Sequence, residues 1–100
     1  MQHSKLVRDK IPEIIRKSGE FPNISIAGEE EYWQKLKEKL QEEVDEFIKD
    51  EKEEELVDIL EVINAITEFK KIDRDKLEHL RGKKAEEKGR FKERIILEKS

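Results

Sequence analysis

Apolar residues recur at intervals of three and four along the middle of the chain, which is the spacing of an amphipathic α-helix. Between residues 29 and 49 this spacing is carried by Trp33, Leu36, Leu40, Val44 and Phe47. Acidic residues crowd the first turn of the segment, where the helix dipole favours negative charge. The pattern therefore predicts a long helix from about Glu29 to Lys49.

A second helix is predicted directly after the first, because Asp50 followed by Glu53 resembles a capping box. We expect it to run to about Lys70 and to form an antiparallel hairpin with the first helix. A surface helix keeps a broad polar face, but the apolar residues of this one cover most of its circumference; they are Leu56, Val57, Ile59, Leu60, Val62, Ile63, Ala65 and Ile66. Such a helix must be covered on two sides, so we expect a partner subunit to complete a helical bundle as a homodimer.

Shorter elements are predicted before the hairpin. Asp9 is expected to cap a brief helix that has Pro12 in its first turn and stops at Gly19. The β-branched run at residues 24–26 is expected to be extended, and the apolar run at residues 95–97 is a candidate partner for it. The two runs together would form a minor two-stranded ribbon.

After the hairpin, Asp73 is expected to cap a fourth helix, which either ends at Gly82 or continues to Gly89. A chain of 100 residues with 34% hydrophobic content is large enough for a single modest core. Residues 1–100 are thus expected to form one all-α domain, a helical bundle built on the central hairpin.

The balance of acidic and basic residues argues against two classes of partner, nucleic acids and membrane surfaces. Twenty-two basic residues against 26 acidic ones leave a net charge of only −4, so the chain is not a polybasic ligand for nucleic acid or for a membrane surface. The absence of cysteine excludes both a disulfide framework and a thiolate metal site. No secretory, transit or membrane-spanning segment is recognisable, and the expectation is a soluble cytoplasmic protein.

Four acidic residues of the hairpin are arranged as two matching pairs. Glu43 and Glu46 stand three apart on the first helix, and Glu55 and Asp58 stand three apart on the second, so each pair shares a helix face. Folding the hairpin about residue 50 brings Glu46 level with Glu55 and Glu43 level with Asp58. The sequence therefore predicts that the four carboxylates meet.

Carboxylates gathered in a partly buried site repel one another and need a neutralising cation. Because the chain has no cysteine and only His3 and His79, neither of which is near the hairpin, structural zinc is disfavoured. A hard divalent ion with oxygen ligands, Mg²⁺ or Mn²⁺, is the natural occupant. The alternative is that these acids are solvated helix faces, since 26 of the 100 residues are acidic and pairs three apart also arise by chance.

Four further side chains receive a structural interpretation. Trp33, at helical spacing with Leu36 and Leu40, is expected in the core, the alternative being a stack on a nucleobase. His3 and His79 are expected at the surface. Glu61 lies one turn beyond Asp58 and is expected either behind the metal ligands or in solvent.

Four segments together resemble a known family. They are KLVRDKIPEII at residues 5–15, EEVDE at residues 42–46, ELVD at residues 55–58 and KKAEEKGRF at residues 83–91. The chain resembles the all-α nucleoside triphosphate pyrophosphohydrolases, and within them the MazG-like and phosphoribosyl-ATP pyrophosphohydrolase-like branch. The resemblance spans nearly the whole chain. It implies a helical bundle that dimerises or tetramerises, dependence on Mg²⁺, and cleavage of a nucleotide between its α and β phosphates.

The acidic motifs of this sequence are similar to the metal signature of that family. The resemblance implies that Glu43, Glu46, Glu55 and Asp58 hold one or two Mg²⁺ ions, which bridge the triphosphate and orient the attacking water. Glu42, or one of the ligands such as Glu43, would accept the proton of that water. Only eight residues separate the two motifs here, whereas many members have a longer loop, and the substrate stays open.

Substrate phosphates also require fixed positive charge. Residues 81–94 contain a local surplus of four basic residues, most of which would form ordinary surface pairs. By resemblance to the family motif, Lys83 and Lys84 are the expected phosphate ligands, joined by Arg8 and Lys10 of the opening motif.

Several functions stay open at this stage. The favoured hypothesis is hydrolysis of a non-canonical nucleoside triphosphate, in cleansing of the nucleotide pool. The alternatives are phosphoribosyl-ATP pyrophosphohydrolase activity and a non-enzymatic helical module for dimerisation or partner binding. Nucleic-acid binding through the basic C-terminal region is disfavoured by the acidic remainder of the chain.

Overall fold

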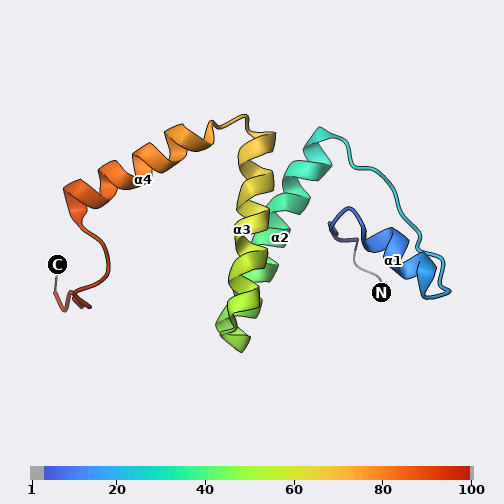
Figure 1. The fold of residues 1–100 in the computed structure, drawn as a ribbon, viewed down its shortest axis with the longest axis horizontal. Helices are drawn as coiled ribbons and strands as arrows, with labels where there is room; N and C mark the ends of the chain where they lie inside the picture. Colours follow the sequence, from blue (N-terminus) through green and yellow to red (C-terminus); the bar gives the residue numbers. More distant parts are fainter. Residues whose placement is uncertain (1–3, 100) are drawn as a thin grey trace.

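The computed structural model describes residues 4–99, and over this range the chain forms four helices and no strand. Their bounds are α1 Ile11–Lys17, α2 Glu29–Asp50, α3 Glu53–Phe69 and α4 Arg74–Lys88 (Figure 1). The prediction of an all-α fold is confirmed. His3 lies outside the described residues. No helix within residues 4–99 combines the length and the apolar character that crossing a membrane requires.

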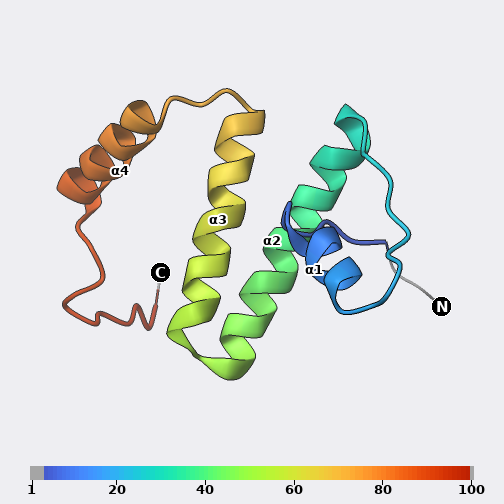
Figure 2. The same ribbon diagram turned by 45° about the vertical axis from the view of Figure 1, so that its right-hand side comes forward.

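The helices α2 and α3 lie side by side and run in opposite directions in both ribbon views (Figures 1 and 2). The turn between them differs from the predicted capping box. Glu51 adopts the left-handed conformation at φ 55° and its N–H donates to the carbonyl of Phe47 at 2.7 Å, while the cap position of α3 is Lys52, with no side-chain bond. Asp50 still belongs to α2, so its side chain is not placed to cap α3.

The first helix also starts without the predicted cap. Its cap position is Lys10, not Asp9, and no side chain bonds to its free N–H groups. Instead the N–H of Ile11 donates to the carbonyl of Arg8 at 3.0 Å, and Pro12 has no N–H to satisfy. The helix ends where expected, because Gly19 adopts φ 94°, a conformation that glycine reaches without strain.

The fourth helix begins as predicted and takes the longer of its two predicted courses. The side chain of Asp73 accepts a hydrogen bond from the N–H of Asp75 at 2.9 Å. The helix passes through Gly82 and ends at Lys88, where Gly89 has φ 84°. Figures 1 and 2 show α4 standing away from the hairpin.

The predicted two-stranded ribbon is wrong for the described chain. Residues 24–26 and 95–97 are neither strands nor bridged to each other. The first run belongs to the connection between α1 and α2, whereas α4 carries the second run to the opposite end of the molecule (Figure 1). Without a neighbouring strand, a short extended run has no partner for its backbone hydrogen bonds.

The core lies along the contact between α2 and α3 and is small. Leu36 is fully buried and Val62 is 8% exposed, and they are the only buried apolar side chains among residues 4–99. At one end of the hairpin Trp33 stacks on Phe69 with ring centroids 5.8 Å apart, and Tyr32 meets the same ring edge-on at 5.2 Å. Trp33 is half-buried in this cluster, and the amine of Lys70 lies 4.3 Å from its ring centre.

We predict that Leu36→Ala lowers the free energy of unfolding by about 2–5 kcal/mol, because the cavity would open at the one fully buried side chain. The matched control is Ile48→Ala on the same helix, where the side chain is 67% exposed and the expected change is within about 0.5 kcal/mol. Urea unfolding at a fixed protein concentration measures both. Equal losses in the two variants would contradict the position of the core.

Candidate metal and phosphate site

The predicted metal ligands lie at two levels of the hairpin. Glu43 on α2 is buried, and Asp58 on α3 is half-exposed; both line the same groove. Glu46 is exposed and Glu55 half-exposed, and both lie nearer the turn, outside the groove lining. Desolvation and then the neighbouring carboxylates of Asp50, Glu46 and Asp58 raise the pKa of Glu55. The acids of the two helices are thus close enough to repel one another.

Lysine side chains neutralise part of this negative charge. The Lys39 amine lies 3.0 Å from Glu42 Oε2 and 3.2 Å from Glu43 Oε1, and the Lys5 amine lies 3.6 Å from Glu42 Oε1. The hydrogen bond from Lys39 lowers the pKa of Glu42 against a smaller effect of desolvation. Burial opposes the charge on Lys39, but its bonds to Glu42 and Glu43 outweigh burial and raise the pKa of Lys39.

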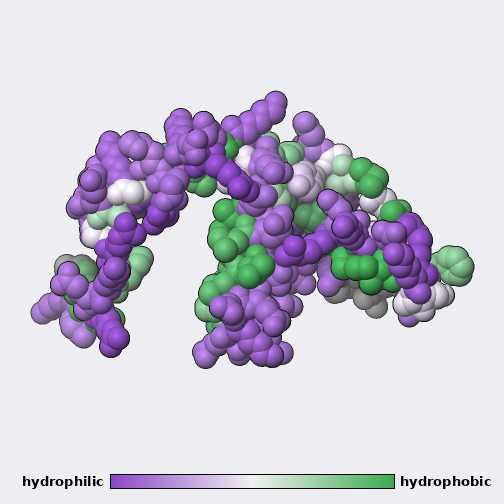
Figure 3. Space-filling view, viewed as in Figure 1, coloured by the Kyte–Doolittle hydropathy of each residue, from purple (hydrophilic) through white to green (hydrophobic). Residues whose placement is uncertain are grey.

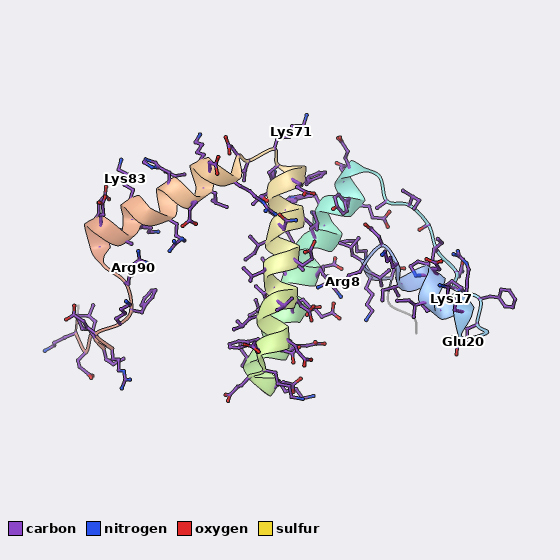
Figure 4. The ribbon with its side chains drawn as sticks, in the orientation of Figure 1. Arg8, Lys17, Glu20, Lys71, Lys83 and Arg90 are labelled. Atoms are coloured by element: carbon purple, nitrogen blue, oxygen red, sulfur yellow. The ribbon has the colours of Figure 1, made fainter. Side chains whose placement is uncertain are left out.

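Arg8 neutralises part of the negative charge of Asp58. Its guanidinium donates to Asp58 Oδ1 at 2.7 Å and joins the segment before α1 to α3 (Figure 4). Both side chains are more than a third exposed, so the pair contributes at most about 1 kcal/mol to stability. The pair holds the basic opening motif, residues 5–15, beside the acids of the hairpin.

The groove between these elements is large enough for a small-molecule ligand. It is open to solvent, encloses about 740 Å³ and lies between the N-terminal segment, α2 and α3. Its charged lining consists of Lys5, Arg8, Asp9, Lys10, Lys39, Glu43, Asp58, Glu61 and Glu68, and its apolar and aromatic lining includes Leu6, Val7, Ile11, Tyr32, Leu36, Val62 and Ala65. Acids, cations and an apolar wall therefore share one surface.

Glu43 provides the test of whether a cation fits. Its Oε2 atom is buried and has no hydrogen-bond partner among the described residues, although Oε1 is paired with Lys39. A buried carboxylate oxygen without a donor is costly unless a cation or a donor binds to it. Across residues 4–99 no three acidic or histidine side chains are already arranged as metal ligands. The donor chemistry fits Mg²⁺, and binding would require Asp58 to release Arg8.

The predicted phosphate ligands fall in two separate places. Arg8 and Lys10 line the groove, as the opening motif predicts. Lys83 and Lys84 lie on α4. Figure 4 shows that Lys83 lies far from Arg8, because α4 extends away from the hairpin. Within one chain Lys83 and Lys84 do not lie near the acids, because α4 does not pack on its own hairpin, so their role as phosphate ligands stays a prediction. His79 is exposed on α4, as expected.

Sequence reasoning missed Lys39 and did not place Glu61 in the groove. Lys39 precedes Glu42 and Glu43 by three and four residues, which is the spacing of an ion pair on one helix face and was a usable signal. Glu61 is exposed to solvent, one of its two expected positions, and it also lines the groove, whose third wall is the N-terminal segment. No pattern within the hairpin could reveal that third wall.

Comparisons with known proteins add little to this geometry. No protein-family model matches the chain, and no solved structure matches it. A 44-residue stretch is 54% identical to part of an uncharacterized protein of Mycolicibacterium smegmatis. The match covers 44% of this chain and 45% of that protein. The function must therefore be argued from the site.

We predict that Glu43→Met raises the free energy of unfolding by on the order of 1 kcal/mol in EDTA, because it removes a buried charge while Lys39 keeps Glu42 as its partner. Urea unfolding is the measurement, and Glu38→Met on an exposed position of α2 is the control. A clear loss of stability in Glu43→Met alone would show that the carboxylate is a structural ion-pair member.

Proposed function

We propose that the protein is a Mg²⁺-dependent nucleoside triphosphate pyrophosphohydrolase. Water would attack the α-phosphorus, the α–β bridging bond would break, and the products would be a nucleoside monophosphate and pyrophosphate. The observation that carries the proposal is the unpartnered buried oxygen of Glu43, beside Asp58 and the basic opening motif in one groove. The resemblance of the same segments to MazG-like pyrophosphohydrolases supports the same reaction.

In this proposal the acids of the hairpin hold the metal. Glu43 and Asp58 would hold it from the groove, and Glu46 and Glu55 would hold it from the level nearer the turn. The Mg²⁺ ion, when bound, neutralises triphosphate charge and lowers the pKa of a coordinated water. Mn²⁺ is an alternative ion, because it accepts the same oxygen ligands.

The cations of the groove bind the substrate phosphates. Arg8 would exchange its bond to Asp58 for a phosphate group, two of whose oxygens can accept parallel hydrogen bonds from the guanidinium. Lys10 and Lys39 line the same groove. These residues hold the triphosphate in place and offset the charge that develops on the leaving pyrophosphate.

The proton of the attacking water goes to Glu42 or Glu43. The bond from Lys39 lowers the pKa of Glu42, which makes Glu42 a weaker base while that bond persists. Release of Lys39 toward a phosphate would restore the basicity of Glu42. Glu43 is the alternative base; its Oε1 is paired with Lys39, and its Oε2 is the oxygen proposed to hold the metal.

The proposed assembly is a homodimer or homotetramer in the cytoplasm. A second copy would complete the bundle around the hairpin and would supply Lys83 and Lys84, which lie away from the acids of their own chain. The proposed substrates are non-canonical nucleoside triphosphates, removed from the nucleotide pool. Phosphoribosyl-ATP is the second candidate substrate, since it carries the same triphosphate.

We predict pyrophosphate release from at least one member of a panel of canonical and damaged nucleoside triphosphates and phosphoribosyl-ATP in the presence of Mg²⁺. Separate assays for pyrophosphate and orthophosphate provide the measurement. Release of orthophosphate alone would contradict cleavage at the α–β bond. No turnover together with no effect of Mg²⁺ or Mn²⁺ on the melting temperature would favour a non-enzymatic helical module.

We predict that Asp58→Asn lowers kcat/KM by about 100-fold or more and abolishes the rise in melting temperature caused by Mg²⁺, because the metal loses a charged ligand. Glu53→Gln, an exposed acid at the start of the same helix, is the matched control and should retain both properties. If Asp58→Asn keeps full activity and the full thermal shift, Asp58 is not a ligand.

A further inference from the structure

A single copy of the chain exposes far more surface than a compact protein of its size. Its accessible surface is 9684 Å², whereas a compact monomer of 12.0 kDa exposes roughly 6,000 Å². Its radius of gyration is 17.8 Å, against about 13 Å for a compact domain of 100 residues. The excess is several times the roughly 800 Å² that each partner buries in a typical stable interface. A second chain could therefore bury enough area for a stable dimer.

Much of the excess belongs to the C-terminal arm, which we define as residues 74–99. Figures 1 and 2 show α4 and its tail extending away from the hairpin. Of the four helices in residues 4–99, only α2 and α3 pack against each other along their length. The apolar side chains of the arm are consequently exposed, namely Leu77, Leu80, Phe91, Ile95, Ile96 and Leu97.

A matching apolar stripe runs along α3. Leu56, Leu60 and Ile63 follow one another at intervals of four and three, so they share one helix face, and they are 45%, 65% and 39% exposed. Figure 3 shows hydrophobic surface along α3 on the side that faces α4 across the gap. The stripe is distinct from the groove, which is lined by Asp58 and Val62 of the same helix.

Charge favours contact between the arm and the hairpin. The arm contains ten basic and six acidic residues, a surplus of four positive charges. Residues 29–70 contain 16 acidic and six basic residues, a surplus of ten negative charges. Opposite potentials of this kind draw the two surfaces together and favour this pairing over contact between two acidic hairpins.

We propose that two copies exchange C-terminal arms, so that the arm of each chain lies along the Leu56, Leu60 and Ile63 stripe of the other. A two-fold arrangement covers both stripes with both arms at once and leaves neither chain with an open face. The proposal deepens the assembly named in the proposed function and is independent of its chemistry.

The absence of cysteine makes a cross-linking test clean. Two full-length variants would be prepared, Ile63→Cys with a size tag and Leu80→Cys without one. The two would be mixed, unfolded and refolded together, and then treated with a short bis-maleimide cross-linker. Arm exchange predicts a cross-linked product that contains one chain of each kind. The control replaces Ile63→Cys by Glu54→Cys, an exposed position off the stripe, and predicts at least a fivefold lower yield.

A double variant with Ile63→Cys and Leu80→Cys in one chain separates exchange from folding back. Exchange predicts cross-links between chains, whereas cross-links confined to one chain would overturn the proposal. Products joining only Ile63→Cys to Ile63→Cys would overturn it in favour of contact between two α3 helices. Light scattering on the wild-type chain should give a molar mass of twice 12.0 kDa. The mass of a monomer at micromolar concentration would also overturn the proposal. None of these measurements uses nucleotide or Mg²⁺, so a failure of catalysis leaves them interpretable.

Discussion

Packing of α2 against α3 is the contact on which the rest of the structure depends. The turn at Glu51 and Lys52 is so short that the two helices must run back along each other, and Leu36 and Val62 seal the contact between them. Once the hairpin is closed, Glu43 and Asp58 border one groove. The N-terminal segment then adds the third wall through the pair between Arg8 and Asp58. The groove therefore depends on the contact between α2 and α3.

The charges of the groove oppose the packing that creates it. Placing Glu43 among buried residues desolvates a carboxylate; nearer the turn, desolvation and then the neighbouring acids raise the pKa of Glu55. Lys39, Lys5 and Arg8 offset part of that repulsion from the rim of the groove. One oxygen of Glu43 nevertheless stays without a partner. A protein selected for stability alone would place an apolar side chain there, and this is why we propose that a ligand binds to these acids.

The small size of the core is the reason we propose an assembly of two copies. A single chain buries only two apolar side chains within residues 4–99, and both belong to the hairpin. The arm and the outer stripe of α3 contribute nothing to the stability of a lone copy while they are exposed. Contact between copies would bury them, stiffen the hairpin and so hold the acids of the groove at a constant separation. In this view the assembly and the site depend on the same two helices.

The sequence by itself determined the helices of this protein and the pairing of its acids along them. Helical periodicity located α2 and α3, and Asp73 and Gly89 marked the ends of α4, because these signals are local. The caps expected at Asp9 and Asp50 failed, since a cap depends on backbone angles at a single residue, which residue type alone does not specify. Only the tertiary structure decided that Arg8 pairs with Asp58, that Glu61 lines the groove and that Lys83 stands apart on α4. Those placements follow from how distant segments pack, and no spacing along one helix encodes the position of another.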